Sequence, residues 1–384
     1  MINEKRLLWE FLKLVQIDSE TTHERWIATY LKEKLHRLGL HVEEDDTKEL
    51  TGCSAGNLIC TFPGTMKNVP KLYFTAHMDT ASPGKGVRPR IDDGYVTSDG
   101  STILGADDKA GIAAMIEVIH VLRENDLEHG DIQFIMTVGE EAALAGARVL
   151  DMNQIQAQFG YTLDGEGKVG TIVTDAPALA TLKAVIYGKS HDTRNDAEKG
   201  LSAIRIATQA IHHMSLGHID GDTTAQIIRF TAGQLPDADL IELICEVRSM
   251  NDAKLFGQID HMESIFHKCA WQNKGRAEIT YERLYPPLSL RQESKVVEIA
   301  RQAALRIGRT PRLAKSRDGS DANIFSSRGI PTAVLGVGYE KIHTTKERMP
   351  LEELYKLAEM VLAIITIVTS EYGKKEKEGD FHGR

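Results

Sequence analysis

Three short apolar segments of this chain are each followed by residues that can bind a metal ion or move a proton. The segments are 72–76, 132–138 and 159–163, and the residues after them are His77-Met78-Asp79, Gly139-Glu140-Glu141 and Asp164, respectively. Short apolar runs are typical of strands that are buried on both faces of a sheet. The ligand crevice of an open α/β sheet lies at the carboxyl ends of its strands. We therefore expect these polar residues to lie close together.

Two more acids lie between the first two segments. Residues 103–111 read Ile-Leu-Gly-Ala-Asp-Asp-Lys-Ala-Gly, so Asp107 and Asp108 are adjacent in a tight turn before a helical run at 112–122. Neighbouring carboxylates repel each other unless a cation neutralises them, although a helix N-terminus by itself also favours acids. The tight turn favours Asp107 as a metal ligand, and its two oxygens would allow it to bridge two ions.

Histidine and carboxylates at strand ends indicate metal-assisted hydrolysis. His77 is a candidate ligand, and Asp79, two residues along the strand, is suited to orient its ring. One member of the pair Glu140 and Glu141 could hold a metal while the other takes a proton from water. This division of roles is the one that hydrolysis at a metal centre requires.

Asp164 and a distant loop residue, His343, complete a set of two imidazoles and three carboxylates, which would serve two zinc-like ions. Each residue taken alone is often solvated or structural, but surface scatter rarely places all of them at successive strand ends. The chain has no G-x-S-x-G elbow, no phosphate-binding P-loop and no dinucleotide fingerprint after the first strand. A hydrolase is therefore favoured over a kinase or an oxidoreductase.

Composition narrows the class of protein further. The chain has 384 residues, of which 42% are apolar, and a formal net charge of −9 without a Lys/Arg block, so nucleic acid is not an expected partner. The four cysteines form no C-x-x-C pair, which fits a reducing compartment. Charged residues interrupt the apolar N-terminus, and no run approaches transmembrane length. We expect a cytoplasmic protein that does not contact a membrane.

The order of predicted elements divides the chain into two domains. Residues 1–177 and 287–384 alternate strands with helices, which indicates an α/β domain with a mostly parallel sheet. This part includes a predicted helix at 142–154 and a hairpin signal, Asp92-Asp93-Gly94. Residues 178–286 show a β-α-β-β-α-β order instead, with helices at 197–214 and 252–269. Because His343 must return to the site of Asp164, this second region is expected to be an insertion.

These motifs resemble those of the peptidase T-like metallopeptidases, dizinc enzymes related to aminoacylases, glutamate carboxypeptidase and succinyl-diaminopimelate desuccinylase. The matching segments span nearly the whole chain and are His77-Met78-Asp79-Thr80, residues 105–111, Gly139-Glu140-Glu141, Leu163-Asp164, residues 319–323 and Ile342-His343-Thr344-Thr345. The resemblance implies an α/β fold with a zinc-exopeptidase-like mixed sheet flanked by helices. A ferredoxin-like (β-α-β-β-α-β) lid and dimerisation domain would be inserted into it.

The resemblance also implies a role for each candidate residue. Asp107 would bridge two divalent ions, with Zn²⁺ as the expected metal and Co²⁺ or Mn²⁺ as alternatives. The other ligands would be His77 and Asp164 at one ion, and Glu141 and His343 at the other. Glu140 would be the general base and Asp79 would orient His77. The Asp107–Asp108 peptide is expected to be cis.

The lid region matches the family in one place and departs from it in two. Arg248 matches the lid arginine that binds a substrate carboxylate. His191, within residues 188–193, stands one position earlier than the family's lid histidine, and residues 230–236 lack the usual Asn. His191 is therefore a candidate substrate contact as well as a candidate surface residue. These departures predict weak turnover, or turnover on substrates other than ordinary tripeptides.

The expected function is the hydrolysis of short peptides by an aminopeptidase or tripeptidase that forms a homodimer through its lids. An N-acyl amino acid amidohydrolase or a carboxypeptidase remains an alternative, because Arg248 would serve any substrate with a free carboxylate. A metal-binding homologue with weak turnover is a third possibility, because the metal residues are complete while the lid is altered.

Overall fold

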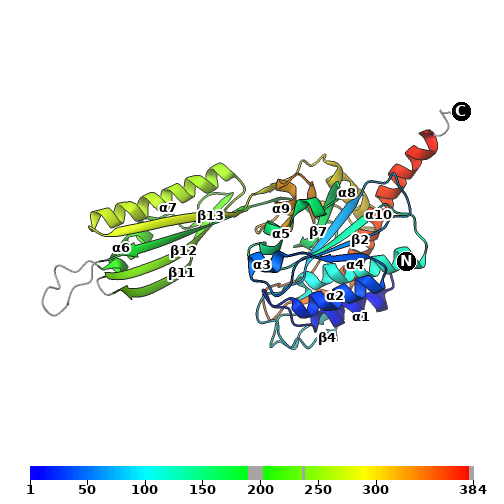
Figure 1. The fold of residues 1–384 in the computed structure, drawn as a ribbon, viewed down its shortest axis with the longest axis horizontal. Helices are drawn as coiled ribbons and strands as arrows, with labels where there is room; N and C mark the ends of the chain where they lie inside the picture. Colours follow the sequence, from blue (N-terminus) through cyan, green and yellow to red (C-terminus); the bar gives the residue numbers. More distant parts are fainter. Residues whose placement is uncertain (189–201, 236–237, 380–384) are drawn as a thin grey trace. The chain divides into compact units, whose positions relative to one another are not determined.

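The computed structural model describes residues 1–188, 202–235 and 238–379, and the chain forms two compact units (Figure 1). Unit 1 consists of Met1–Asp175 together with Ser289–Arg384, and unit 2 consists of Ala176–Leu288. Unit 2 is therefore inserted between the two segments of the chain that form unit 1.

Unit 1 supplies most of the helices. They are α1 (Glu4–Val15), α2 (Arg25–Arg37), α3 (Thr47–Thr51), α4 (Ala106–Glu124), α5 (Ala145–Val149), the 3-10 helix η1 (Met152–Gln154), α8 (Lys295–Arg306), α9 (Asp321–Ser327) and α10 (Leu351–Gly379). Across the described parts of both units, no helix combines the length and the apolar character needed to cross a bilayer.

The strands of this part of the chain form one large and one small sheet. They are β1 (His41–Glu44), β2 (Leu58–Phe62), β3 (Leu72–His77), β4 (Arg90–Asp92), β5 (Tyr95–Thr97), β6 (Ile132–Thr137), β7 (Phe159–Gly165), β8 (Thr171–Ala176), β14 (Leu288–Ser289), β15 (Arg312–Lys315), β16 (Thr332–Gly336) and β17 (Arg348–Pro350). The large sheet has the order β1-β2-β6-β3-β7-β16-β8-β14 with β15 beside β8, and the small sheet has the order β17-β5-β4.

The large sheet is parallel at its centre and of mixed direction toward its edges. The pairs β6–β3, β3–β7, β7–β16 and β15–β8 are parallel, whereas β1–β2, β2–β6 and β16–β8 are antiparallel. The predicted mixed sheet flanked by helices is confirmed. The continuous parallel part of the sheet is its centre, β6-β3-β7-β16.

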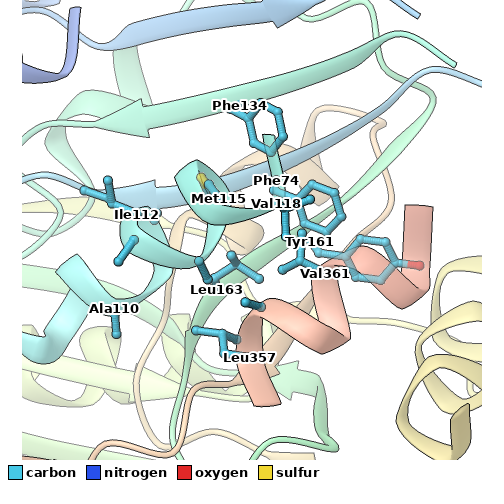
Figure 2. Close-up of a cluster of buried hydrophobic side chains, with 14 of the residues drawn as sticks. Phe74, Ala110, Ile112, Met115, Val118, Phe134, Tyr161, Leu163, Leu357 and Val361 are labelled. Carbon is cyan, nitrogen blue, oxygen red and sulfur yellow. The ribbon is translucent and has the colours of Figure 1, made fainter. Parts of the chain in front are cut away.

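Both faces of the central strands are buried, which explains their continuous apolar runs. All six residues of β3 are buried, and alternate side chains belong to different cores. Figure 2 shows Phe74 beside Phe134 and Tyr161, within the cluster that also contains residues of α4 and α10. Tyr73 belongs instead to the core that contains Phe325 of α9.

This arrangement determines where the functional residues lie. Because β6, β3 and β7 are parallel neighbours, the residues that follow them emerge at the same edge of the sheet. His77, the last residue of β3, is paired with Thr137, the last residue of β6. Helix α4 precedes β6 in the chain and packs against β3 and β7, so its N-terminal turn also belongs to this region.

Two local predictions have different outcomes. The Asp92-Asp93-Gly94 hairpin is confirmed: β4 and β5 pair antiparallel, and positive φ values at Asp93 (44°) and Gly94 (79°) suit a tight hairpin turn. The helix expected at 142–154 is wrong, since only the five residues of α5 and the short η1 form. Positive φ values at Ala143 (58°) and Leu144 (62°) prevent a helix from starting earlier.

The sequence prediction also missed strand β8. Residues 171–176, to which the sequence analysis assigned no element, join the large sheet between β16 and β15. Asp175 interrupts this short apolar run, so its local pattern is weak.

Unit 2 is a five-stranded antiparallel sheet with two helices. Its elements are β9 (Ala178–Tyr187), α6 (Ala203–His213), β10 (Gly217–His218), β11 (Thr223–Leu235), β12 (Ala238–Ser249), α7 (Asp252–Gln272) and β13 (Arg276–Tyr285), and the strand order is β10-β11-β12-β9-β13. The predicted order of elements is present with β10 as an addition. Of the helix predicted at 197–214, residues 197–201 lie outside the described residues.

Unit 2 has its own core. Alternate residues of β9, such as Leu182 and Ala184, are buried together with residues of α6 and α7, whereas Lys183 between them is exposed. One face of this sheet is therefore covered by the helices, and the other carries polar and partly exposed side chains.

Candidate metal centre

The ends of β3 and β7 bring His77 and Asp164 together at the edge of the large sheet. His77 Nε2 lies 3.9 Å from Asp164 Oδ1 and 3.1 Å from Asp107 Oδ1. His77 is buried, and its Nδ1 lies 2.9 Å from the backbone carbonyl of Asp79. A hydrogen bond donated by Nδ1 to that carbonyl leaves Nε2 free to act as a ligand.

A second group of ligand atoms lies beside the first. His343 Nε2 is 2.8 Å from Glu141 Oε1 and 3.2 Å from Asp107 Oδ2. Asp107 therefore has one oxygen beside His77 and the other beside His343. This placement of the two oxygens is what a carboxylate that bridges two cations requires.

Asp108, the residue after Asp107, contacts both β3 and α4. Its carboxylate lies within 4.8 Å of potential ligand atoms of His77 and Asp164, but its two oxygens accept hydrogen bonds from the backbone N–H groups of His77 and Gly111, both at 3.3 Å. Asp108 thus connects β3 to α4. The peptide bond between Asp107 and Asp108 is cis, as predicted.

The carboxylate of Asp79 holds the segment that carries the two glutamates. It accepts hydrogen bonds from the backbone N–H groups of Glu140 (3.0 Å) and Glu141 (3.2 Å), and from the hydroxyl of Thr21 (3.0 Å). Its Oδ1 is 3.6 Å from His77 Nδ1, which is farther than the backbone carbonyl of the same residue. Asp79 therefore contacts both His77 and the turn after β6.

The close packing of these groups changes their acidity. Burial, together with the charge of Asp164, raises the pKa of Glu140 well above its usual value. Burial also opposes ionisation of Asp107, but His343 and His77 outweigh it and hold the pKa of Asp107 below its usual value. The neighbouring carboxylates of Asp107 and Glu141 raise the pKa of His343 to about 11. Carboxylates and imidazoles this close together hold protons between them unless cations take their place.

The residues fit a pair of divalent cations. The two ligand groups, His77 with Asp108 and Asp164, and Asp107 with Glu141 and His343, each have atoms within 4.8 Å of one another. Glu141 Oε1 is buried but accepts no hydrogen bond from any residue that the structure describes, although His343 is near. An oxygen without a hydrogen bond beside an imidazole is well suited to bind a metal ion, and nitrogen with carboxylate oxygen suits Zn²⁺, Co²⁺ and Mn²⁺.

Four supporting residues received no role in the sequence analysis. The hydroxyl of Tyr339 donates to Asp164 Oδ1 at 3.1 Å, and the hydroxyl of Thr137 donates to Asp321 Oδ2 at 2.6 Å. Burial raises the pKa of Asp321 to about 6. Glu347 accepts from the backbone of the Asp107 turn. Asp321 lies in the quoted 319–323 motif, whereas no local pattern marks Tyr339.

Of the two candidate substrate residues, the structure describes Arg248, which lies in unit 2. Arg248, on β12, is hydrogen-bonded through its guanidinium to the Tyr285 hydroxyl at 3.3 Å and to Glu246 Oε2 at 3.4 Å. His191 lies outside the described residues, as does most of the altered 188–193 segment. Of the altered 230–236 segment, residues 230–235 belong to β11.

Comparison with known proteins assigns the chain to a protein family. The model of peptidase family M20/M25/M40 matches residues 73–367. The chain belongs to this family. Its peptidase character, predicted from the strand-end residues and the quoted motifs, is thereby confirmed, as is the resemblance to peptidase T-like enzymes.

Three similar proteins illustrate the relationship of this M20 peptidase to others. A crystal structure of aminopeptidase PepT from Bacillus cereus ATCC 10987 has 50% identity and a TM-score of 0.87, and the match covers 96% of this chain and 99% of that one. A tripeptidase structure from Staphylococcus aureus has 47% identity and a TM-score of 0.91, covering 96% and 100%. The uncharacterized protein YqjE of Bacillus subtilis is 53% identical, covering 95% and 99%.

The geometry predicts different metal losses for two ligand substitutions. In Asp107→Ala both ions should be depleted, because this residue faces both groups, whereas His343→Ala should mainly remove one. Elemental analysis after gel filtration measures the metal content per chain. The control is His41→Ala, which removes an exposed histidine of β1. Retention of both ions in Asp107→Ala would show that this carboxylate does not bridge.

Proposed function

We propose that this M20 peptidase is a dinuclear-metal aminopeptidase that acts on tripeptides and other short peptides. The observation that carries the proposal is the Asp107 carboxylate, which has one oxygen beside His77 and the other beside His343. The similarity at 50% and 47% identity to structures described as an aminopeptidase and a tripeptidase supports this substrate class. The four cysteines, all free and buried, support a cytoplasmic location.

The ligand roles follow from the two groups. We assign His77 and Asp164 to one ion, Glu141 and His343 to the other, and Asp107 to both. Zn²⁺ is the proposed metal, with Co²⁺ or Mn²⁺ as alternatives. Asp79 positions His77 through its carbonyl and the two glutamates through its carboxylate.

The bound cations would polarise the scissile carbonyl and make an attacking water more acidic. Glu140 follows β6 beside Glu141, and its side chain is half-buried. In the proposed mechanism its carboxylate takes the proton from the water and then gives it to the leaving amine. The same side chain thus acts first as a base and then as an acid.

Unit 2 is proposed to act as the lid and as the dimerisation domain. Arg248 is its proposed contact for a substrate carboxylate, and His191 a further candidate. Strand β13 lies at an edge of the sheet, and an unpaired edge can pair with a second copy.

The substitution Glu140→Gln tests the proposed base. The amide keeps the shape of the side chain but cannot accept a proton, so kcat should fall at least about a hundredfold while the metal content persists. Steady-state kinetics and elemental analysis measure the two quantities. Glu33→Gln, at an exposed position of α2, is the control. Turnover close to that of the wild type would remove Glu140 from the mechanism.

Digestion of end-blocked peptides tests the substrate class. An aminopeptidase should release the first residue of a free tripeptide and leave its N-acetylated form intact, whereas a carboxypeptidase would accept the acetylated form and an amidohydrolase would cleave N-acetyl amino acids. Arg248→Ala should raise KM more for peptides with a free carboxylate than for amidated ones, unlike the control Arg229→Ala.

The altered lid predicts kcat/KM for simple tripeptides below about 10⁵ M⁻¹s⁻¹.

Light scattering tests the proposed assembly. The mass should correspond to a homodimer across the micromolar range, because the lid edge would be covered by its partner. A mass of one chain at every concentration would contradict dimerisation through unit 2.

A further inference from the structure

Glu347 is a buried carboxylate that binds the backbone of the turn that carries Asp107. Its Oε2 accepts hydrogen bonds from the N–H groups of Leu104 and Gly105, both at 2.8 Å, and its Oε1 accepts from the N–H of Asp107 at 3.1 Å. The residue is 1% exposed, so these bonds are shielded from water. Both oxygens are therefore used by one short segment of backbone.

This carboxylate binds an irregular segment that leads into the regular part of α4. The N-cap residue Gly105 has no side chain and has a φ of 75°, and the backbone at Asp107 and Asp108 is not helical. Backbone N–H groups outside a regular helix need other acceptors when they are buried. Glu347 supplies these acceptors from a position about 240 residues later in the chain.

The same loop carries His343. Residues 340–348 are closed by two backbone hydrogen bonds between Glu340 and Arg348, at 2.9 and 3.0 Å, and by an ion pair of their side chains. Within this closed loop, Glu347 N donates to the carbonyl of Thr344 at 3.0 Å. His343 has a positive φ of 59°, a backbone conformation that a non-glycine residue keeps only when its surroundings support it.

The loop therefore contacts both the side chain and the backbone of Asp107. His343 Nε2 lies 3.2 Å from the Asp107 carboxylate, and Glu347 accepts from the Asp107 backbone N–H. A displacement of the loop would move the imidazole and the backbone of the bridging carboxylate relative to each other. The Glu347 hydrogen bonds resist this displacement without requiring Glu347 to contact a metal.

We propose that Glu347 is a positioning residue that sets the distance between His343 and Asp107, and thereby the affinity of the centre for its cations. The proposal rests on the function proposed above only in taking these residues as metal ligands. A residue that merely stabilised the fold would affect unfolding but not the metal affinity of the folded protein.

The substitution Glu347→Gln separates these two roles. A glutamine amide has one accepting oxygen, so its NH₂ group would face at least one N–H of the turn. Glu117→Gln is the matched control, because Glu117 is also buried on α4 and accepts from the backbone N–H of Asn3 and from Arg6. It lies ten residues after Asp107, which is about 15 Å along the helix.

The measurement is the titration of metal-depleted protein with Zn²⁺ in competition with a chromophoric chelator, at a temperature where circular dichroism shows every variant to be folded. In Glu347→Gln at least one Zn²⁺ dissociation constant should rise about 10–100-fold, the usual effect of removing a residue that supports a ligand. For peptide hydrolysis, kcat should fall while KM changes little. In Glu117→Gln both dissociation constants should equal those of the wild type.

Unchanged Zn²⁺ dissociation constants in folded Glu347→Gln would overturn the proposal. If that variant does not fold, Glu347→Asp decides instead, because its shorter carboxylate cannot reach all three N–H groups and should weaken Zn²⁺ binding, whereas native affinity would overturn the proposal. If wild-type protein binds Zn²⁺ but cleaves no peptide, the proposed function fails, and the comparison of dissociation constants still tests Glu347.

Discussion

The centre of unit 1 depends on holding several carboxylates close together in a buried place. Asp107, Asp108 and Asp164 all lie around one imidazole, that of His77. Like charges at such distances repel strongly where water is excluded, and the raised pKa of Asp164, caused by burial and by the charge of Asp107, reflects this. Positive charge has to be supplied, and the arrangement of the ligand atoms suits divalent cations.

Backbone N–H groups donate hydrogen bonds to several carboxylates around this site. Asp79 accepts from the turn after β6, Asp108 accepts from β3 and α4, and Glu347 accepts from the turn before α4. Each of these carboxylates connects a strand or a loop to a segment that carries a candidate ligand. The hydrogen bonds that position the ligands therefore also give these buried carboxylates the N–H partners that they need.

The two units contribute different things. Unit 1 contains all the candidate ligands. Four of them lie at the ends of parallel strands and at the start of a helix, where the cores on both sides of the sheet resist small displacements, and His343 lies in the closed loop 340–348. Unit 2 has a separate core and a sheet with one partly exposed face, on which Arg248 lies. In the proposed enzyme the first unit performs the chemistry and the second selects the substrate.

The sequence by itself determined the features that depend on local patterns. The apolar runs of β3, β6 and β7, the acids and histidine that follow them, the hairpin turn and the order of elements in unit 2 are visible in residues that are near one another in the chain. The motifs at these strand ends were also enough to predict the peptidase family.

The tertiary structure decided the features that depend on distant segments. Only the folded chain shows that His343 and Glu347 contact the Asp107 segment, that Tyr339 donates to Asp164, and that the Asp79 carboxylate holds the turn after β6. It also shows that only short helices form within the helix predicted at 142–154, and that β8 belongs to the large sheet. Such contacts join residues up to about 240 positions apart, and packing and hydrogen bonding across that separation leave no periodic pattern in the sequence.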